Sequence, residues 1–128
     1  MSAATNFLEN KVLDHVLGEG VRNYTSPAVL TVGLFSSDPG ETGAGTEISG
    51  TGYARTGVTF GAASAGSATN SANVTFPTAG AGGWGSVTHA GVFDGTSMLF
   101  YGILTIAKVV SESDTFQINS GQLTITLD

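Results

Sequence analysis

The chain has 128 residues, a length that fits one domain with a single core. Only 11% of its residues are charged, well below the share of about 25% that is usual for soluble domains. The net charge is −6, and the four basic residues are dispersed along the sequence, so the chain lacks the basic patch that binds a phosphate backbone. We therefore expect no direct binding to nucleic acid, and a surface so poor in charge favours contact with protein partners.

The sequence contains no cysteine, which excludes disulfides and thiolate metal sites. The first ten residues show no basic segment followed by an apolar run. No apolar stretch is as long as the about 18 residues that a membrane-spanning helix needs. We expect a protein that is made in the cytoplasm, without a signal peptide, and that does not enter a membrane.

An amphipathic helix is predicted within an N-terminal arm of residues 1–20. Asn6 is a candidate N-cap, Glu9 stands at the capping-box position, and Gly18 and Gly20 end the helix. A helix of about three turns is not stable alone in water, so its apolar face must dock either on its own sheet or on a neighbouring subunit. Both alternatives remain open. That apolar face consists of Leu8, Val12, Leu13, Val16 and Leu17.

The apolar residues alternate with a period of two in the remainder of the chain, residues 21–128, as is typical of β-strands. Residues 37–52 form a long polar loop with five glycines, and residues 61–71 form a linker of small residues. With no helix between the strands, the pattern predicts an all-β fold, an antiparallel β-sandwich or jelly roll of about eight strands with one short N-terminal α-helix. The predicted strands cover residues 29–35, 53–60, 74–76, 84–93, 98–104, 108–110, 115–118 and 122–127.

No catalytic constellation is evident in the sequence. His15 lies in the predicted helix, and His89 lies within a strand, on the same face as Val87 and Phe93. Histidines in such places are more often hydrogen-bonded or interface residues than catalysts. A G-x-S-x-G elbow and a plausible pair of catalytic carboxylates are both missing. We therefore expect a protein that is not an enzyme.

Two groups of side chains suggest binding chemistry. Asp38, Glu41 and Glu47 share one loop and offer the oxygen ligands that calcium prefers, but their spacing matches no EF-hand, so a solvated loop is the favoured interpretation. We expect no metal and no cofactor. The aromatic residues could stack on sugars, but the core or a subunit contact is favoured for them. These residues are Tyr24, Tyr53, Trp84 and Tyr101.

The order of the segments carries a resemblance to a known family. A helix FLENKVLDHVLG is followed by LTVGLFSSDPG, GTEISGTGYARTGVTFG, SATNSANVTFPTA, WGSVTHAGVFD, LFYGILT and a final SGQLTITLD. This set, from about Asn6 to Asp128, resembles a family of small virion proteins of tailed phages. Members of that family are often labelled tail-fibre or minor capsid proteins, and the family offers no catalytic residues.

The resemblance implies a capsid decoration (cement) protein on the virion surface, synthesised in the cytoplasm of the host bacterium. Such a protein bridges subunits of the major capsid protein and contacts copies of itself, as a dimer or trimer, in a symmetric array. The alternative is a tail-fibre or tail-tip adhesion module that binds the host surface. Pairing of edge strands between copies is also expected. The candidate partner-contact residues come mainly from the helix and the 37–52 loop and are Phe7, Leu8, Val12, Val16, Asp38, Glu41, Glu47, Tyr53 and Trp84.

Overall fold

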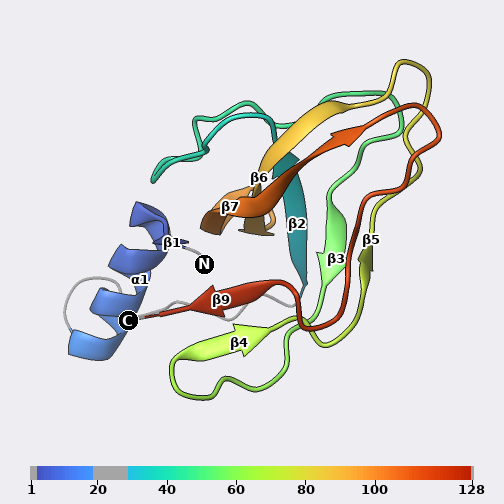
Figure 1. Cartoon of the computed structure of the whole chain (residues 1–128). Coiled ribbons are helices and arrows are strands. Elements are labelled where there is room, and N and C mark those ends of the chain that lie inside the picture. Colours follow the sequence, from blue (N-terminus) through green and yellow to red (C-terminus); the bar gives the residue numbers. More distant parts are fainter. Residues whose placement is uncertain (1–2, 19–28, 128) are drawn as a thin grey trace.

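The computed structural model describes residues 3–18 and 29–127 of the chain. Most of the elements in these residues are strands, and the one helix lies between the first strand and the others, which confirms the all-β prediction (Figure 1). The boundary between residues 20 and 21, predicted to separate arm and sandwich, lies outside the described residues. The elements are β1 (Ala3–Ala4), α1 (Asn6–Leu17), β2 (Leu30–Phe35), β3 (Thr56–Val58), β4 (Ser67–Thr69), β5 (Val74–Thr75), β6 (Gly85–Asp94), β7 (Ser97–Val110), β8 (Gln117–Ile118) and β9 (Thr124–Thr126).

The strands form one five-stranded sheet and two small ribbons. The sheet has the order β1-β7-β6-β2-β3, while β4 pairs with β9 and β5 pairs with β8. Every pair of neighbours is antiparallel. The ribbons and the main sheet enclose the main core between them, as the prediction of a sandwich requires. The jelly-roll part of that prediction is not confirmed by this strand order.

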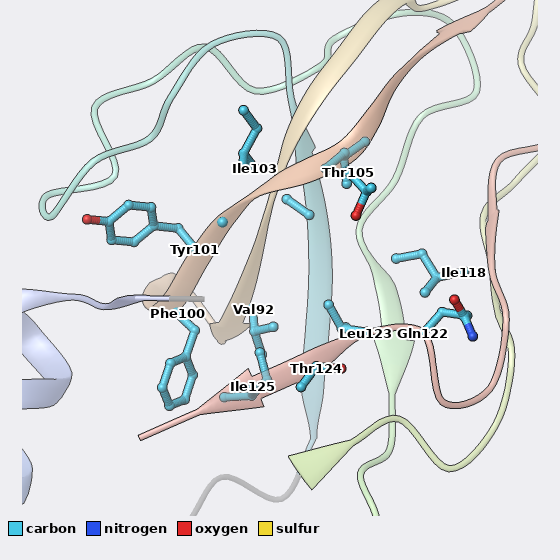
Figure 2. Close-up of a pocket in the computed structure, with 13 residues that line it drawn as sticks. Val92, Phe100, Tyr101, Ile103, Thr105, Ile118, Gln122, Leu123, Thr124 and Ile125 are labelled. Carbon is cyan, nitrogen blue, oxygen red and sulfur yellow. The ribbon is translucent and has the colours of Figure 1, made fainter. Parts of the chain in front are cut away.

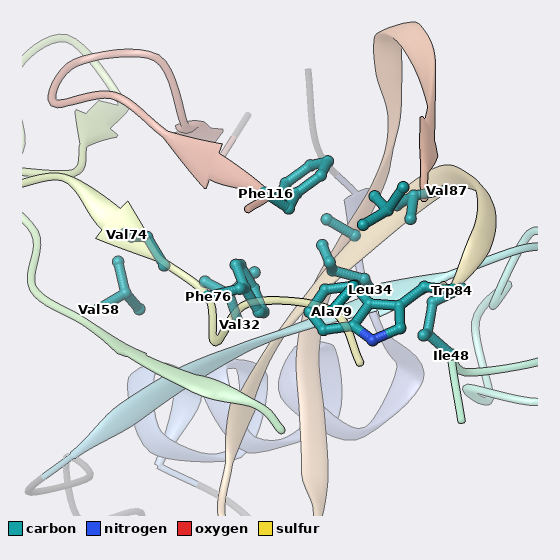
Figure 3. Close-up of a cluster of buried hydrophobic side chains, with 12 residues drawn as sticks. Val32, Leu34, Ile48, Val58, Val74, Phe76, Ala79, Trp84, Val87 and Phe116 are labelled. Atoms are coloured by element: carbon teal, nitrogen blue, oxygen red, sulfur yellow. The ribbon is translucent and has the colours of Figure 1, made fainter. Parts of the chain in front are cut away.

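The main core is rich in aromatic contacts (Figure 3). Phe76 meets Phe116 edge to face, with 5.6 Å between ring centroids. Trp84 meets Tyr53, which packs against this core, in the same way at 5.4 Å. The indole Nε1–H of Trp84 donates a hydrogen bond of 2.9 Å to the carbonyl oxygen of Thr51, so its burial leaves no polar group unpaired. The other buried members of this cluster are Val32, Leu34, Ile48, Val58, Val74, Ala79, Val87, Ala90 and Val110.

One glycine permits this packing around the indole. A β-carbon on Gly50 would lie 2.5 Å from Trp84 Cδ1 and 2.7 Å from the carbonyl oxygen of Gly83. Any larger residue at position 50 would push the loop away from the indole. The loop of residues 37–52 therefore closes directly over the core.

The N-cap of the helix lies one residue before the predicted cap, and the helix itself begins at Asn6. Thr5, not Asn6, is the N-cap, and its hydroxyl accepts a bond of 3.4 Å from the backbone N–H of Leu8. The same hydroxyl donates to the carbonyl oxygen of Met98 at 2.6 Å, which ties the start of α1 to β7. The predicted capping box of Asn6 and Glu9 was wrong, because the Thr5 hydroxyl reaches both the backbone N–H of Leu8 and the carbonyl oxygen of Met98. Gly18 ends the helix in a left-handed conformation (φ 79°), as predicted.

Three strand predictions need correction. The segment 61–71 is not only a linker, because it contains β4, which pairs with β9. The predicted strands 98–104 and 108–110 are one strand, β7, interrupted only by a shift of its register against β6. Strand β1 was not predicted, since two alanines carry no periodic signal. No helix in the described part of the chain has the length and apolar character needed to cross a bilayer.

Candidate interaction surfaces

The helix docks on the domain by one end only. Leu8 is buried, Val12 is half-buried, and Leu13, Val16 and Leu17 are exposed. The first turn therefore packs on its own domain, whereas the last turn presents an apolar face. Phe7 is also exposed, and the Lys11 ammonium lies 5.9 Å from its ring centroid.

The 37–52 loop is fixed against the helix and β7. The backbone N–H of Asn6 donates to the carbonyl oxygen of Glu41 at 3.4 Å, and the Tyr101 hydroxyl donates to Glu41 Oε1 at 2.8 Å. Within the loop, Asp38 Oδ1 accepts the backbone N–H of Gly40 at 2.9 Å. Phe7 and Glu41 line the same pocket of about 300 Å³. The two regions chosen from the sequence as contact regions thus lie side by side.

Glu47, near the end of the same loop, is the centre of a hydrogen-bonded cluster. Its Oε2 accepts the Tyr53 hydroxyl at 2.6 Å and Arg55 Nε at 2.9 Å, and its Oε1 accepts Arg55 Nη2 at 2.9 Å. The backbone N–H of Leu34 donates to the Tyr53 hydroxyl at 2.9 Å. The pairing of β2 with β3 stops at Val32, so Leu34 lies past it on β2. The Tyr53 hydroxyl therefore takes the place of a backbone partner for the N–H of Leu34.

The cluster rests on a second, smaller apolar group on the face of the sheet opposite the main core. Phe35, Phe93 and Met98 form that group, and the guanidinium carbon of Arg55 lies 3.6 Å from the Phe93 ring centroid. A β-carbon on Gly33 would lie 2.9 Å from Glu47 Oε2 and 2.9 Å from Phe93 Cε1. Because Gly33 has no side chain, the Glu47 carboxylate and the Phe93 ring can both pack against the sheet at this position.

The cluster predicts how stability depends on pH. The hydrogen bonds from Arg55 lower the pKa of Glu47 against the opposing effect of burial, and burial together with the bond to Glu47 raises the pKa of Tyr53. A lowered carboxyl pKa stabilises the fold above the ordinary value of 4.5, and this contribution is lost as the pH falls through the lower folded-state pKa. A raised tyrosine pKa stabilises the fold below 10.0, and this contribution is lost at higher pH.

Urea unfolding between pH 3 and pH 11, followed by circular dichroism, measures both effects. We expect Glu47→Gln to remove part of the acid loss of stability and Tyr53→Phe to remove part of the alkaline loss. The wild-type chain at the same pH is the reference for both variants, because each substitution also removes the bond that shifts the pKa of the other residue. A variant that kept the full wild-type slope at its own end would contradict this interpretation.

The three loop acids do not converge on a metal site. Glu47 faces Arg55 and Tyr53, Glu41 faces Tyr101, and Asp38 binds a backbone N–H of its own loop. In the described residues, no three side chains of His, Cys, Asp or Glu form a group that could hold a metal ion. Glu41 therefore ties the loop to β7 and Glu47 ties it to Tyr53 and Arg55, whereas Asp38 acts within the loop.

His89 does not share a face with Val87, contrary to prediction. It lies opposite Phe35 on β2, a member of the second apolar group, whereas Val87 is in the main core. The register of β6 against β7 shifts between Val87 and His89, which reverses the alternation that the sequence suggested. The Nδ1 of His89 lies 2.8 Å from the Thr88 hydroxyl.

Two of the candidate contact residues have little surface to offer a partner. Leu8 is 6% exposed and Trp84 is 7% exposed. For Trp84 the interpretation as a core residue is confirmed. Tyr53 is half-buried, with its hydroxyl bound to Glu47. Phe7, Val16, Asp38 and Glu41 are exposed, and contact with a partner stays a prediction for them.

Comparison with known families identifies a relative of the whole domain. Residues 3–126 match the model of the family described as podophage GP4 fiber I protein gp80. The chain belongs to this family. The match spans α1 and every strand of the structure. Membership in the gp80 family confirms the resemblance to small virion proteins of tailed phages and makes this chain a phage structural protein. No individual curated protein matches the sequence.

In this gp80 family member, one exposed surface was missed as a candidate site. Ile103, Ile106 and Val109, all on β7, are 70%, 68% and 70% exposed. The signal was present in the sequence, because LFYGILTIAKVV holds a single charge. Dividing it into two strands hid the fact that one long strand carries these side chains at an edge of the sheet.

Proposed function

We propose that the chain is a structural subunit of a virion fibre and that it acts through contacts between proteins, without catalysis and without a cofactor. The observation that carries the proposal is the match of residues 3–126 to a family whose description names a fibre protein. The low charge and the exposed apolar side chains of α1 and β7 support a subunit that is covered by neighbours.

A direct role in binding host glycans is less well supported. An adhesion platform needs exposed aromatic rings, yet Trp84 is buried and Tyr53 is half-buried with its hydroxyl bonded inside the domain. Tyr101 is also half-buried and holds Glu41. The proposal is therefore a building unit of the fibre, with its surfaces directed at other virion proteins.

Capsid decoration is the second candidate. The observation that favours it is the single surface formed by the start of α1, the fixed 37–52 loop and Tyr101. A rigid surface on a compact domain suits a protein that bridges subunits of the major capsid protein. In this case many copies would cover the head of the particle.

Immunogold electron microscopy of purified virions tests the two locations. Antibodies are raised against the purified chain, and the same serum depleted on that chain is the control. Label confined to fibres supports the first proposal, and label spread over the head supports the second. Intact particles without label, alongside detection of the chain only in the unassembled fraction, would overturn both.

A further inference from the structure

Among the described residues, strand β7 has an open edge over most of its length. On the side away from β6 it pairs with β1 only at Phe100 and Tyr101. Beyond Gly102, no residue of the described ranges 3–18 and 29–127 pairs with that side of β7. The backbone N–H and C=O groups of such an edge are a template for another strand.

This edge carries little of the usual protection against pairing, namely one lysine and one irregularity in register. Natural proteins cover edge strands or mark them with charges, but Lys108 is the only charged residue in β7. Between the pairs Val87–Lys108 and His89–Ile103, β7 has four residues where β6 has one. Ile106 lies within that extra length and is 68% exposed. The edge therefore offers both backbone groups and aliphatic side chains.

We propose that β7 pairs with β7 of a second copy of this chain, antiparallel and about a two-fold axis at Ile106. The exposed aliphatic residues follow one another at intervals of three, so their pattern is symmetric about Ile106. An antiparallel pair centred there sets Ile103 opposite Val109 of the second copy, on both sides of the axis. It also sets Lys108 opposite Leu104 and keeps the two lysines apart.

The charge distribution favours a second copy at this edge. The chain carries a net charge of −6, so two copies repel each other over most of their surface. Between Asp94 and Glu112 the sequence has no acidic residue, so β7 can approach its own copy without contact between like charges. The same patch on both partners is what a two-fold interface requires.

A groove beside β7 continues the apolar surface (Figure 2). It lies between β7 and β9, has a volume of about 130 Å³, and is lined by Val92, Phe100, Ile125 and other residues. Ile103 and Leu104 line this groove as well. A strand added at the edge would extend the main sheet past the groove and shield it from water.

The size of the edge sets the expected strength. About nine residues at about 3.3 Å each give an edge of about 30 Å, which covers less than the about 800 Å² per partner of a standard interface. We therefore expect weak association, with a Kd in the range from about 10 µM to about 1 mM. Many copies in one particle would strengthen it through multivalency.

Sedimentation velocity over that concentration range tests the interface. We expect a monomer–dimer equilibrium for the wild-type chain and a Kd at least about tenfold higher for Ile106→Lys. Val29→Lys is the matched control, because Val29 is a similarly exposed aliphatic residue (66%) away from β7 and outside the candidate contact regions, and its Kd should stay at the wild-type value. A wild-type monomer throughout, a trimer, or a dimer that Val29→Lys weakens and Ile106→Lys does not would overturn the proposal.

Cysteine crosslinking tests the register independently, since the wild-type chain has no cysteine. Under mild oxidation, Ile106→Cys should form a disulfide-linked dimer at least about tenfold faster than Val29→Cys, because directly opposed β-carbons lie within reach of a disulfide. A mixture of Ile103→Cys and Val109→Cys should crosslink faster than either variant alone. Equal rates for all variants would contradict the pairing. Circular dichroism establishes that each variant is folded.

This inference deepens the proposed role as a virion subunit and rests on it for its biological meaning. The two can fail separately. A chain found in virions but monomeric and uncrosslinked in solution overturns the β7 interface alone. A chain that dimerises through β7 but is missing from virions overturns the proposed function alone.

Discussion

Replacing Trp84 by alanine is expected to lower the free energy of unfolding by about 3–5 kcal/mol. The indole is 7% exposed, meets the Tyr53 ring edge to face at 5.4 Å and donates a hydrogen bond to Thr51. Its removal leaves a cavity in the main core beside Gly50, which has no side chain to fill it. Urea unfolding followed by circular dichroism measures this loss without relying on the lost tryptophan fluorescence.

Trp84→Phe is the matched control for this substitution. It keeps most of the apolar volume and removes the indole N–H, which leaves the Thr51 carbonyl oxygen without that bond. We expect a loss of about 1–2 kcal/mol, clearly smaller than for alanine. If Trp84→Ala had the same urea midpoint of unfolding as the wild-type chain, the result would contradict the placement of the indole in the core.

Asn70→Ala is expected to lower the free energy of unfolding by about 3 kcal/mol. Asn70 is 1% exposed, and its side-chain amide joins two distant parts of the chain. The Nδ2 group donates to the carbonyl oxygens of Ala72 and Asn119 at 2.9 and 3.0 Å, and Oδ1 accepts the backbone N–H of Leu123 at 2.9 Å. Alanine removes all three bonds next to the ribbon that β4 and β9 form, and among the described residues only the Asn119 carbonyl oxygen keeps another partner, the backbone N–H of Gln122 at 3.0 Å.

Asn73→Ala is the matched control, because it makes the same change at an exposed position. Asn73 accepts one hydrogen bond, from the backbone N–H of Ser120 at 2.8 Å. Water can replace that partner, so the expected loss is below about 1 kcal/mol. If urea unfolding gave the same loss of unfolding free energy for both variants, burial of the Asn70 amide would not be what stabilises its contacts with Asn119 and Leu123.

The sequence predicted those features that depend on local patterns. Periodicity gave the helix and the strands at 29–35 and 84–93, the Asp94-Gly95 turn separated β6 from β7, and Gly18 ended α1. These signals are carried by residues a few positions apart, so no knowledge of tertiary contacts is needed.

Features that depend on distant contacts were not predicted. Asn70 looked like part of a linker because its partners, Asn119 and Leu123, lie about fifty residues further on. Thr5 is the cap, and its hydroxyl is held in place by the hydrogen bond that it donates to the carbonyl oxygen of Met98. His89 changed face through a shift of register that depends on the length of β7. Among the candidate contact residues, Glu47 and Tyr53 were singled out without Arg55, which donates to the same Glu47 carboxylate as Tyr53 and completes the cluster.

Quantitative mass spectrometry of purified virions tests the central claim most directly, namely that this gp80 family member is a structural component of the phage particle. Isotope-labelled peptides of the chain and of the major capsid protein give the number of copies per particle. We expect a fixed copy number that survives density-gradient purification and washing in high salt. A chain that is abundant in infected cells but absent from washed, infectious particles would contradict the account.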